Sequence, residues 1–346
     1  MTYLPLLLAD PSPALRYLVL RELFQRPMDD PEVQELNTLR MYDPLIRDLV
    51  KNQNPEGSWE SADPRGAIQG EKLYTTAQVL IRLGYLGYGP DHKTVRQGAE
   101  FIFSLQLEDG SWPLPASRTT VDGVDGYSMI PLQTAIPLRG LAACGFSKDS
   151  RAEKAYEWLL NQRLDDGAWP VGLAAGNYGG IAGYRRLPHS RWGCRSNTTA
   201  ALICLSLNPQ RCTSLPAQRA LDHLLGRETR EHHTLGYEVA RTIGAEKARG
   251  YLTYFARFDP ALVLDLCWRS AASVDDPRIS DLIDFIRGLQ GSYGLWEYPE
   301  RPQVSRWLTF DLLRSLSQLD KNTAEEWISL EPRTPFQPYP KTERRY

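Results

Sequence analysis

The sequence predicts an all-α fold, an α/α toroid in which inner and outer helices alternate, and two observations support it. The first is an internal repeat, in which a glutamine is followed by a glycine-containing turn and a tryptophan, at Trp59, Trp112, Trp169 and Trp296. The second is the pattern around each turn, with an amphipathic helix before it and a more apolar helix after it. No strand periodicity competes with this pattern. We therefore expect apolar helices inside a ring of amphipathic ones.

The repeat is predicted to have five copies. The interval from Trp169 to Trp296 is about twice as long as the earlier ones, so it should contain one degenerate copy. The segment 220–226 is the candidate, because it imitates an outer helix but has lost the glutamine and the tryptophan. Five copies, an N-terminal helix at 12–25 and a pairing segment near 238–252 could close a six-fold ring of the α6/α6 type.

Each outer helix should have an Asp or a Pro near its start, because Asp caps helix N-termini and Pro suits the first turn. These residues are Asp91, Asp149, Pro216 and Pro277. The inner helices are expected at about 70–87, 127–145, 196–208, 258–272 and 305–319.

Composition and domain organisation point to a soluble globular protein. No Gly/Ser linker divides the chain, so we expect one domain over 1–346, with repeat units at about 30–320 and an irregular tail at 321–346. A net charge of −2 gives no reason to expect nucleic acid as a partner, and no stretch approaches the ~20 apolar residues of a membrane span. Five scattered cysteines and a start without a basic region favour the reducing cytoplasm.

The Gln…Gly-Ser/Ala-Trp pattern resembles the QW repeat of squalene and oxidosqualene cyclases, which protein prenyltransferase β-subunits share in looser form. The resemblance extends from about Asp30 to Leu319, and the stretch 305–316 is similar to the last inner helix of short bacterial squalene-cyclase-like proteins. It implies a toroid with an apolar central cavity. The repeat residues themselves we interpret as structural, with the Gln amide satisfying carbonyls at a helix end and the Trp packing on the next unit.

The resemblance also implies a catalytic acid, because class II terpene cyclases protonate an alkene or epoxide with an Asp of a DxDD motif. The nearest string, Ser273-Val-Asp275-Asp276, lacks the first Asp. It also lies at the start of the outer helix that leads to Gln290. We therefore interpret Asp276 as a helix cap that faces solvent.

Three other aspartates are candidates for the acid. Asp122 and Asp125 lie in a Gly-rich turn before an inner helix, where two carboxylates could share one proton; the alternative is an ordinary turn in water. Asp259 precedes Pro260 and the next inner helix, so it is an N-cap or a cavity acid. Aromatic rings would then stabilise cationic intermediates by cation–π attraction, and the candidates are Tyr74, Tyr127, Trp192, Trp268 and Trp307.

The loop 172–195 departs most from the repeat. It contains Tyr184, Trp192, Arg191 and Arg195. These side chains could form a lid that stacks on an apolar substrate and holds an acidic head group. A solvated basic loop is the alternative.

No metal or other cofactor is predicted. The segment Asp125-Gly-Tyr-Ser128 resembles the zinc segment of protein prenyltransferases, but Gly126 stands where that family has a Cys. Phe310 ends the stretch where the family supplies a His. A zinc site needs about three protein ligands, so the sequence argues against protein prenylation. His189 and Cys194 could approach a metal, but no third ligand accompanies them.

The resemblance and the candidates together predict a terpene-cyclase-like enzyme that acts on an isoprenoid or polycyclic apolar substrate, by acid-initiated cyclisation or isomerisation. The alternative is a non-catalytic toroid that binds a lipid or a protein. The expected partner is an apolar small molecule, not nucleic acid. Peripheral contact with a membrane and the oligomeric state stay open.

Overall fold

The computed structural model describes residues 4–60, 71–112, 118–121, 124–127, 131–170, 187, 190–226, 234–246, 259–322 and 327. Its contacts divide the chain into two compact units. The unit that contains both termini, here the terminal unit, comprises Met1–Lys51, Glu228–Lys247 and Phe258–Tyr346. The middle unit comprises Asn52–Arg227 and Ala248–Arg257.

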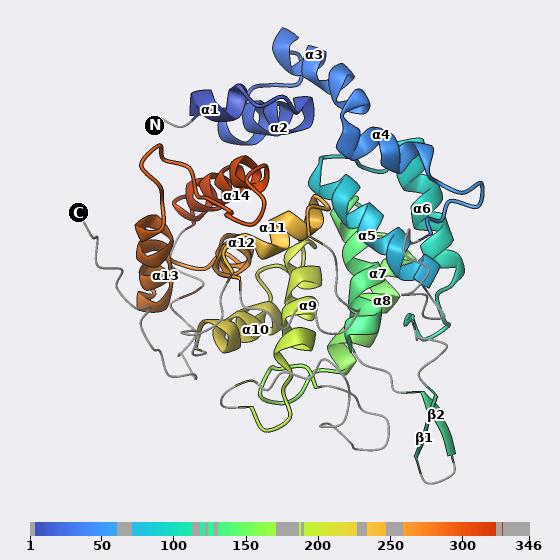
Figure 1. Cartoon of the computed structure of the whole chain (residues 1–346). Helices are drawn as coiled ribbons and strands as arrows, with labels where there is room; N and C mark the ends of the chain where they lie inside the picture. Colours follow the sequence, from blue (N-terminus) through green and yellow to red (C-terminus); the bar gives the residue numbers. More distant parts are fainter. Residues whose placement is uncertain are drawn as a thin grey trace. The chain divides into compact units, whose positions relative to one another are not determined.

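The described residues of the middle unit form three helix pairs and a short hairpin (Figure 1). The more apolar helices, which are the inner ones, are α5 (Glu71–Tyr85), α7 (Pro131–Ala143) and α9 (Arg195–Ser206). The amphipathic outer helices are α6 (Lys93–Ser104), α8 (Ser150–Asn161) and α10 (Leu215–Leu225). The inner helices pack side by side in the order α5, α7, α9, and each outer helix packs on its own inner helix. The hairpin pairs β1 (Arg118–Val121) with β2 (Val124–Tyr127).

Glycine permits the close approach of α5 to α7. A methyl group at Gly140 would lie 2.8 Å from the carbonyl oxygen of Ala77, and one at Gly84 would lie 2.5 Å from the backbone of Ala143. Backbones this close leave α7 buried along almost its whole length, as expected for an inner helix.

The terminal unit contains the remaining helices. Its N-terminal part is α1 (Leu4–Leu8), α2 (Pro13–Leu18), the π-helical η1 (Val19–Leu23), α3 (Pro31–Leu39), η2 (Arg40–Tyr42) and α4 (Pro44–Lys51). Its C-terminal part is α11 (Tyr237–Thr242), α12 (Pro260–Arg269), α13 (Pro277–Gly288) and α14 (Val304–Leu319). The inner helices α12 and α14 pack on each other, α13 covers α12, and α11, α1 and η1 contact α14.

The repeat turns hold their tryptophans by recurring hydrogen bonds. The backbone N–H of Trp59, Trp112, Trp169 and Trp296 donates to a threonine hydroxyl on the inner helix that follows, at 2.9–3.2 Å. In the last three, the indole N–H also donates to a carbonyl of the preceding outer helix, ten residues earlier, at 2.7–2.9 Å. All four indoles are buried, so the predicted structural role of these residues is confirmed.

The repeat glutamines connect each repeat turn to the next copy of the repeat. The Gln53 amide donates to the Gly57 carbonyl at 3.0 Å and to the Thr94 carbonyl of α6 at 2.9 Å. Gln106 makes the equivalent bonds to Gly110 and to Arg151 of α8. The amides therefore satisfy carbonyls, as predicted, but those of the turn and of the next outer helix. The turn glycines Gly57, Gly110, Gly167 and Gly294 have φ of 77–97°, a region that favours glycine.

The predicted class, all-α with inner and outer helices of the α/α-toroid type, is confirmed, and the β1–β2 hairpin is the only sheet among the described residues. Helix α10 contains most of the segment proposed as the degenerate copy and packs on α9, while the number of copies stays a prediction. Asp91 lies near the start of α6, as expected, although His92 is the N-cap of that helix. One boundary was wrong, because 124–127 form a strand where the inner helix α7 was expected to begin. Closure of the ring stays a prediction.

One predicted environment is wrong. Asp276 does cap α13, by accepting from the backbone N–H of Arg278 at 2.9 Å. It does not face solvent, however, because its carboxylate is buried, pairs with the Arg278 guanidinium at 2.8 Å and accepts from the Trp327 indole at 3.0 Å. The residue that covers this cap therefore comes from the segment predicted as an irregular tail.

Candidate functional site

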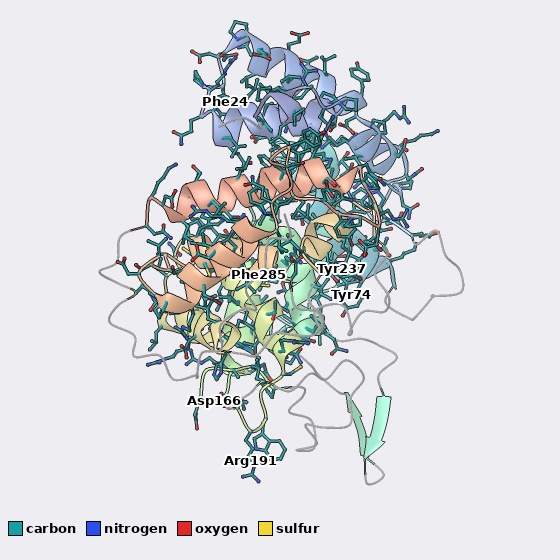
Figure 2. The ribbon with its side chains drawn as sticks, turned by 60° about the vertical axis from the view of Figure 1, so that its left-hand side comes forward. Phe24, Tyr74, Asp166, Arg191, Tyr237 and Phe285 are labelled. Atoms are coloured by element: carbon teal, nitrogen blue, oxygen red, sulfur yellow. The ribbon has the colours of Figure 1, made fainter. Side chains whose placement is uncertain are left out.

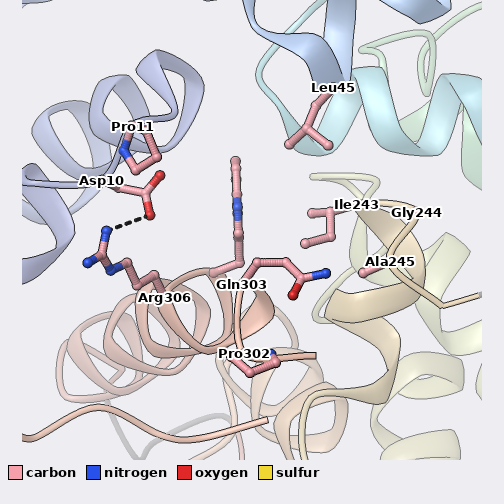
Figure 3. Close-up of a pocket in the computed structure, with 10 residues that line it drawn as sticks. Asp10, Pro11, Leu45, Ile243, Gly244, Ala245, Pro302, Gln303 and Arg306 are labelled. Atoms are coloured by element: carbon pink, nitrogen blue, oxygen red, sulfur yellow. Dashed lines mark hydrogen bonds and ion pairs between the residues drawn. The ribbon is translucent and has the colours of Figure 1, made fainter. Parts of the chain in front are cut away.

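A pocket of about 600 Å³ lies within the terminal unit (Figure 3). The turn between α1 and α2, the helix α4, the turn after α11 and the start of α14 form its wall. The lining residues are Asp10, Pro11, Leu45, Ile243, Gly244, Ala245, Pro302, Gln303, Arg306 and Trp307. The volume falls in the range of about 300–1,000 Å³ that is typical of small-molecule sites.

Most of this wall is apolar, and Trp307 is its largest side chain. Trp307 lies in the first turn of α14 and is only 4% exposed. It is one of the aromatic residues predicted to contact a substrate, and it lines this pocket. An indole in this position can pack on an apolar ligand and attract a cation over its face.

One ion pair lies in the pocket wall. Nη1 of Arg306 lies 3.1 Å from Oδ2 of Asp10, and the other oxygen of Asp10 accepts from the backbone N–H of Ser12 at 2.8 Å (Figure 3). Arg306 belongs to α14, and Asp10 lies in the turn before α2. The ion pair therefore connects the C-terminal and N-terminal parts of the terminal unit. Asp10 is the one carboxyl group among the described residues that line the pocket.

Asp259 is a buried carboxyl group that connects two helix N-termini. It is 3% exposed and does not line the pocket. Its oxygens accept from the backbone N–H groups of Gly236 and Ala261 at 2.9 and 3.0 Å, and of Glu238 at 2.8 Å. Burial raises the pKa of Asp259 to about 7, although these three hydrogen bonds act in the opposite direction. The N-cap interpretation is confirmed, and the role as an acid stays a prediction.

A second group of buried acids, which the sequence interpretation missed, lies between α12 and α14. The Arg314 guanidinium pairs with Asp311 on its own helix, with Asp265 of α12 at 3.4 Å and with Glu22 of η1 at 3.4 Å. Burial raises the pKa of Asp311 to about 6. The spacing of Asp311 and Arg314, one helical turn apart among the apolar residues Phe310, Leu312 and Leu313, is the signal that could have revealed this group.

Trp268 belongs to this second group. Its indole N–H donates to Asp265 at 3.0 Å, and the Arg269 guanidinium lies 4.4 Å from the centre of its ring. Although burial opposes it, the Arg269 and Arg314 guanidiniums hold the pKa of Asp265 below its usual range. The Trp268 indole therefore contacts side chains of its own helix, Asp265 and Arg269. Its contact with a substrate stays a prediction.

Four further candidates belong to the described residues of the middle unit: Tyr74, Arg191, Trp192 and Arg195. Tyr74 is buried in the core, and its hydroxyl donates to the Gln133 carbonyl at 3.2 Å. Arg191 points away from the helices (Figure 2), and its guanidinium lies 4.9 Å from the ring centre of Trp192, which is 41% exposed. Arg195 is the first residue of α9. These contacts leave the lid interpretation a prediction.

The remaining positions cannot be placed by their side chains. Asp125 and Tyr127 belong to β2, where they pair with Thr120 and Arg118 across the hairpin. Their side chains lie outside the described part of the structure, as do the whole residues Asp122 and Tyr184. The position of the predicted Asp122–Asp125 pair thus stays a prediction.

The described part of the chain shows neither a cluster of metal ligands nor a helix suited to a membrane. Within the described ranges, no three His, Cys, Asp or Glu side chains gather as the ligands of a metal ion would. The described helices include none with the length and apolar character that a membrane crossing requires. Cys194 is buried, and its predicted neighbour His189 lies outside the described residues.

Comparison with known proteins supports the resemblance in one part of the chain. Residues 33–180, which contain three of the repeat tryptophans, match the model of the squalene-hopene cyclase C-terminal domain. The squalene–hopene cyclase of Bradyrhizobium diazoefficiens is 30% identical over 123 residues, and that of Zymomonas mobilis is 27% identical over 123 residues. Lanosterol synthase of Saccharomyces cerevisiae is 25% identical over 130 residues. The predicted relation to squalene cyclases is thus confirmed as a distant homology.

The extent of these matches is limited. Each squalene–hopene cyclase match covers 35% of this chain and 18% of the relative, and the lanosterol synthase match covers 36% and 17%. Among solved structures, a type II terpene cyclase from Scytonema is similar with a TM-score of 0.34 and 15% identity, over 81% of this chain and 97% of that one. The arrangement of the helices is shown by the contacts within each of the two units.

Proposed function

We propose that this protein is a terpene-cyclase-like enzyme that binds an isoprenoid or polycyclic apolar molecule and converts it by acid-initiated cyclisation or isomerisation. The observation that carries the proposal is the homology of residues 33–180 to squalene–hopene cyclases, together with the repeat turns that those residues form. The relatives are named for the cyclisation of squalene. The pocket in the terminal unit gives such a molecule an apolar surface beside Trp307.

The reaction needs a protonated carboxyl group. Such an acid transfers its proton to an alkene carbon, a second alkene attacks the resulting cation to close a ring, and loss of a proton gives an isomer of the substrate. The carboxyl group must be kept protonated near neutral pH by burial or by a neighbouring carboxylate. Asp122 and Asp125 would supply this pair, and Asp259, with a pKa of about 7, is the described alternative.

A product assay tests the proposal. Purified protein is incubated with squalene and with shorter linear polyprenes, and products of unchanged mass but new retention time are sought by gas chromatography with mass spectrometry. We expect an isomeric product, which the Asp122→Asn/Asp125→Asn double variant should lose while it stays folded. Asp48→Asn, at an exposed carboxylate, is the matched control. Full activity in both the double variant and Asp259→Asn would contradict the proposed acids.

A non-catalytic lipid-binding protein is the second candidate. It is favoured by the ion pair in the pocket, because the one carboxyl group described there, Asp10, is engaged by Arg306 rather than placed to donate a proton. This candidate predicts that a polyprene binds with a measurable heat and is recovered unchanged. Trp307→Ala should then weaken binding without any product being formed by either protein.

A further inference from the structure

We infer that the pocket in the terminal unit binds an amphiphile, an apolar chain that ends in an anionic oxygen group such as a carboxylate or a phosphate, with Arg306 as the anchor of that group. The inference rests on the proposed function in one respect, that an apolar molecule occupies this pocket. It adds the chemistry of one end of that molecule. It applies to an enzyme and to a binding protein alike.

The two members of the Arg306–Asp10 ion pair differ in how many hydrogen-bonding atoms they leave for a ligand. Each oxygen of Asp10 accepts one hydrogen bond, from the Ser12 backbone N–H and from Arg306, and each keeps a second lone pair. A guanidinium has five N–H donors, and among the described atoms only one donor of Arg306 is paired, the one on Nη1. The pair is neutral overall, but it offers the pocket more hydrogen-bond donors than acceptors.

Exposure points the same way. The side chain of Arg306 is 34% exposed, whereas that of Asp10 is 11% exposed. A ligand that enters the pocket therefore meets the guanidinium more readily than the carboxylate. A planar guanidinium binds an oxyanion through two parallel N–H bonds, so a carboxylate or phosphate fits this donor better than a neutral hydroxyl does.

The other residues of the pocket wall favour an apolar chain at the other end of the ligand. Leu45, Ile243 and Trp307 provide apolar surface, and Gln303, the N-cap of α14, adds one uncharged polar group. An apolar chain on these residues would gain the free energy of burial, while its charged end would stay at the ion pair. A cationic head group would instead meet the excess donors of Arg306 and would be repelled by its charge.

Binding of matched ligands tests this inference. The affinities of a prenyl carboxylic acid, the prenyl monophosphate and the prenyl alcohol of equal chain length are measured by titration calorimetry on the full chain. We expect the two anions to bind more tightly than the alcohol by roughly tenfold, which is ~1.4 kcal/mol, because a hydrogen bond to a charged group is stronger than one to a neutral hydroxyl. The monophosphate and the acid then separate a preference for either head group from the shared charge.

Two variants make the result specific to the pair. Arg306→Gln should remove the difference between anion and alcohol but keep binding of the alcohol. Asp10→Asn should strengthen binding of the anions, because the competing carboxylate is gone while the guanidinium remains. Arg301→Gln is the matched control, since Arg301 is half-exposed, pairs with Glu246 at 3.7 Å and does not line the pocket. Thermal unfolding of each variant checks that the fold is kept.

The outcomes distinguish the inference from the proposed function. Equal binding of acid, phosphate and alcohol, unchanged by Arg306→Gln, would overturn the anionic head group and leave the apolar ligand in place. If none of the three binds and Trp307→Ala changes nothing, the pocket is not the site at all, and the inference falls with it. A gain in anion affinity for Asp10→Asn, opposite in sign to the loss for Arg306→Gln, would support it.

Discussion

The backbone N–H of Trp169 donates to the hydroxyl of Thr198 at 2.9 Å, which fixes the repeat turn onto the inner helix α9. Trp59, Trp112 and Trp296 make the same bond, to Thr76, Thr134 and Thr309. Each of these threonines is buried, so the hydroxyl satisfies an N–H that water cannot reach. The repeat is therefore held at three points: the glutamine, the indole and this hydroxyl.

Removing one such hydroxyl should destabilise the protein without altering its packing. Thr198→Val keeps the shape of the side chain but leaves the Trp169 N–H buried and unpaired, which costs about 1–3 kcal/mol. Thr198→Ser, which keeps the hydroxyl and loses a methyl group, is the matched control. Urea unfolding followed by far-UV circular dichroism gives the free energies. A valine variant as stable as the wild type would show that the bond contributes nothing net.

The tryptophans should matter mainly by their volume. Trp112→Ala removes a fully buried indole, and large-to-small changes of this kind cost about 3–5 kcal/mol. Trp112→Phe keeps much of the apolar surface but loses the indole N–H bond to the Ile102 carbonyl. It should fall between the wild type and the alanine variant in thermal unfolding. If phenylalanine is as harmful as alanine, the hydrogen bond rather than the volume holds the turn.

Much of this fold follows from patterns that a sequence displays. The glutamine, glycine and tryptophan of each turn lie within a few residues of one another, and helical periodicity marks the pairs around them. The threonines could not be found in this way. They lie 17, 22, 29 and 13 residues after their tryptophans, because the connection to the inner helix differs in length in every copy.

The site was harder to predict because it depends on segments far apart in the chain. The ion pair of the pocket joins residues 296 positions apart, and no local spacing brings Asp10 to Arg306. Burial was misjudged for a similar reason. Asp276 has the sequence of an exposed cap, yet Trp327 covers it from the tail. By contrast, the N-cap role of Asp259 could be predicted, because Pro260 directly follows it.

At the buried ion pairs of Arg314, the loss of one charge should destabilise the protein more than the loss of two opposite charges. Arg314→Met leaves Asp311 and Asp265 buried without this cation, and breaking a buried pair costs about 3–5 kcal/mol. Asp311→Leu in the same chain removes one of these carboxylates and should restore part of the stability. The free energy of unfolding of both single variants and the double variant gives the coupling. Additive losses would contradict a shared network.

The pH dependence of stability should reveal the state of Asp259. Its pKa is about 7 in the folded protein, against ~3.9 for an unperturbed Asp in the unfolded chain. Between these values the folded state binds more protons than the unfolded state, so the free energy of unfolding falls as pH rises from ~4 through about 7. Asp311, raised to about 6, contributes a fall of the same sign.

Asp259→Asn isolates the contribution of this one group. The Asn carbonyl oxygen can still accept from Gly236 and Ala261, whose N–H groups both bond to one oxygen of Asp259, while the amide nitrogen loses the bond to Glu238. The variant should therefore be less stable at low pH but should lose less stability between pH 5 and pH 7 than the wild type, because the amide does not titrate. Urea unfolding at pH 5, 6, 7 and 8 measures this slope, and Asp48→Asn, at an exposed carboxylate, should keep the wild-type slope. An unchanged slope in Asp259→Asn would mean that the three backbone hydrogen bonds outweigh burial and that Asp259 is already ionised at pH 5. It could then no longer serve as the protonated acid of a cyclase.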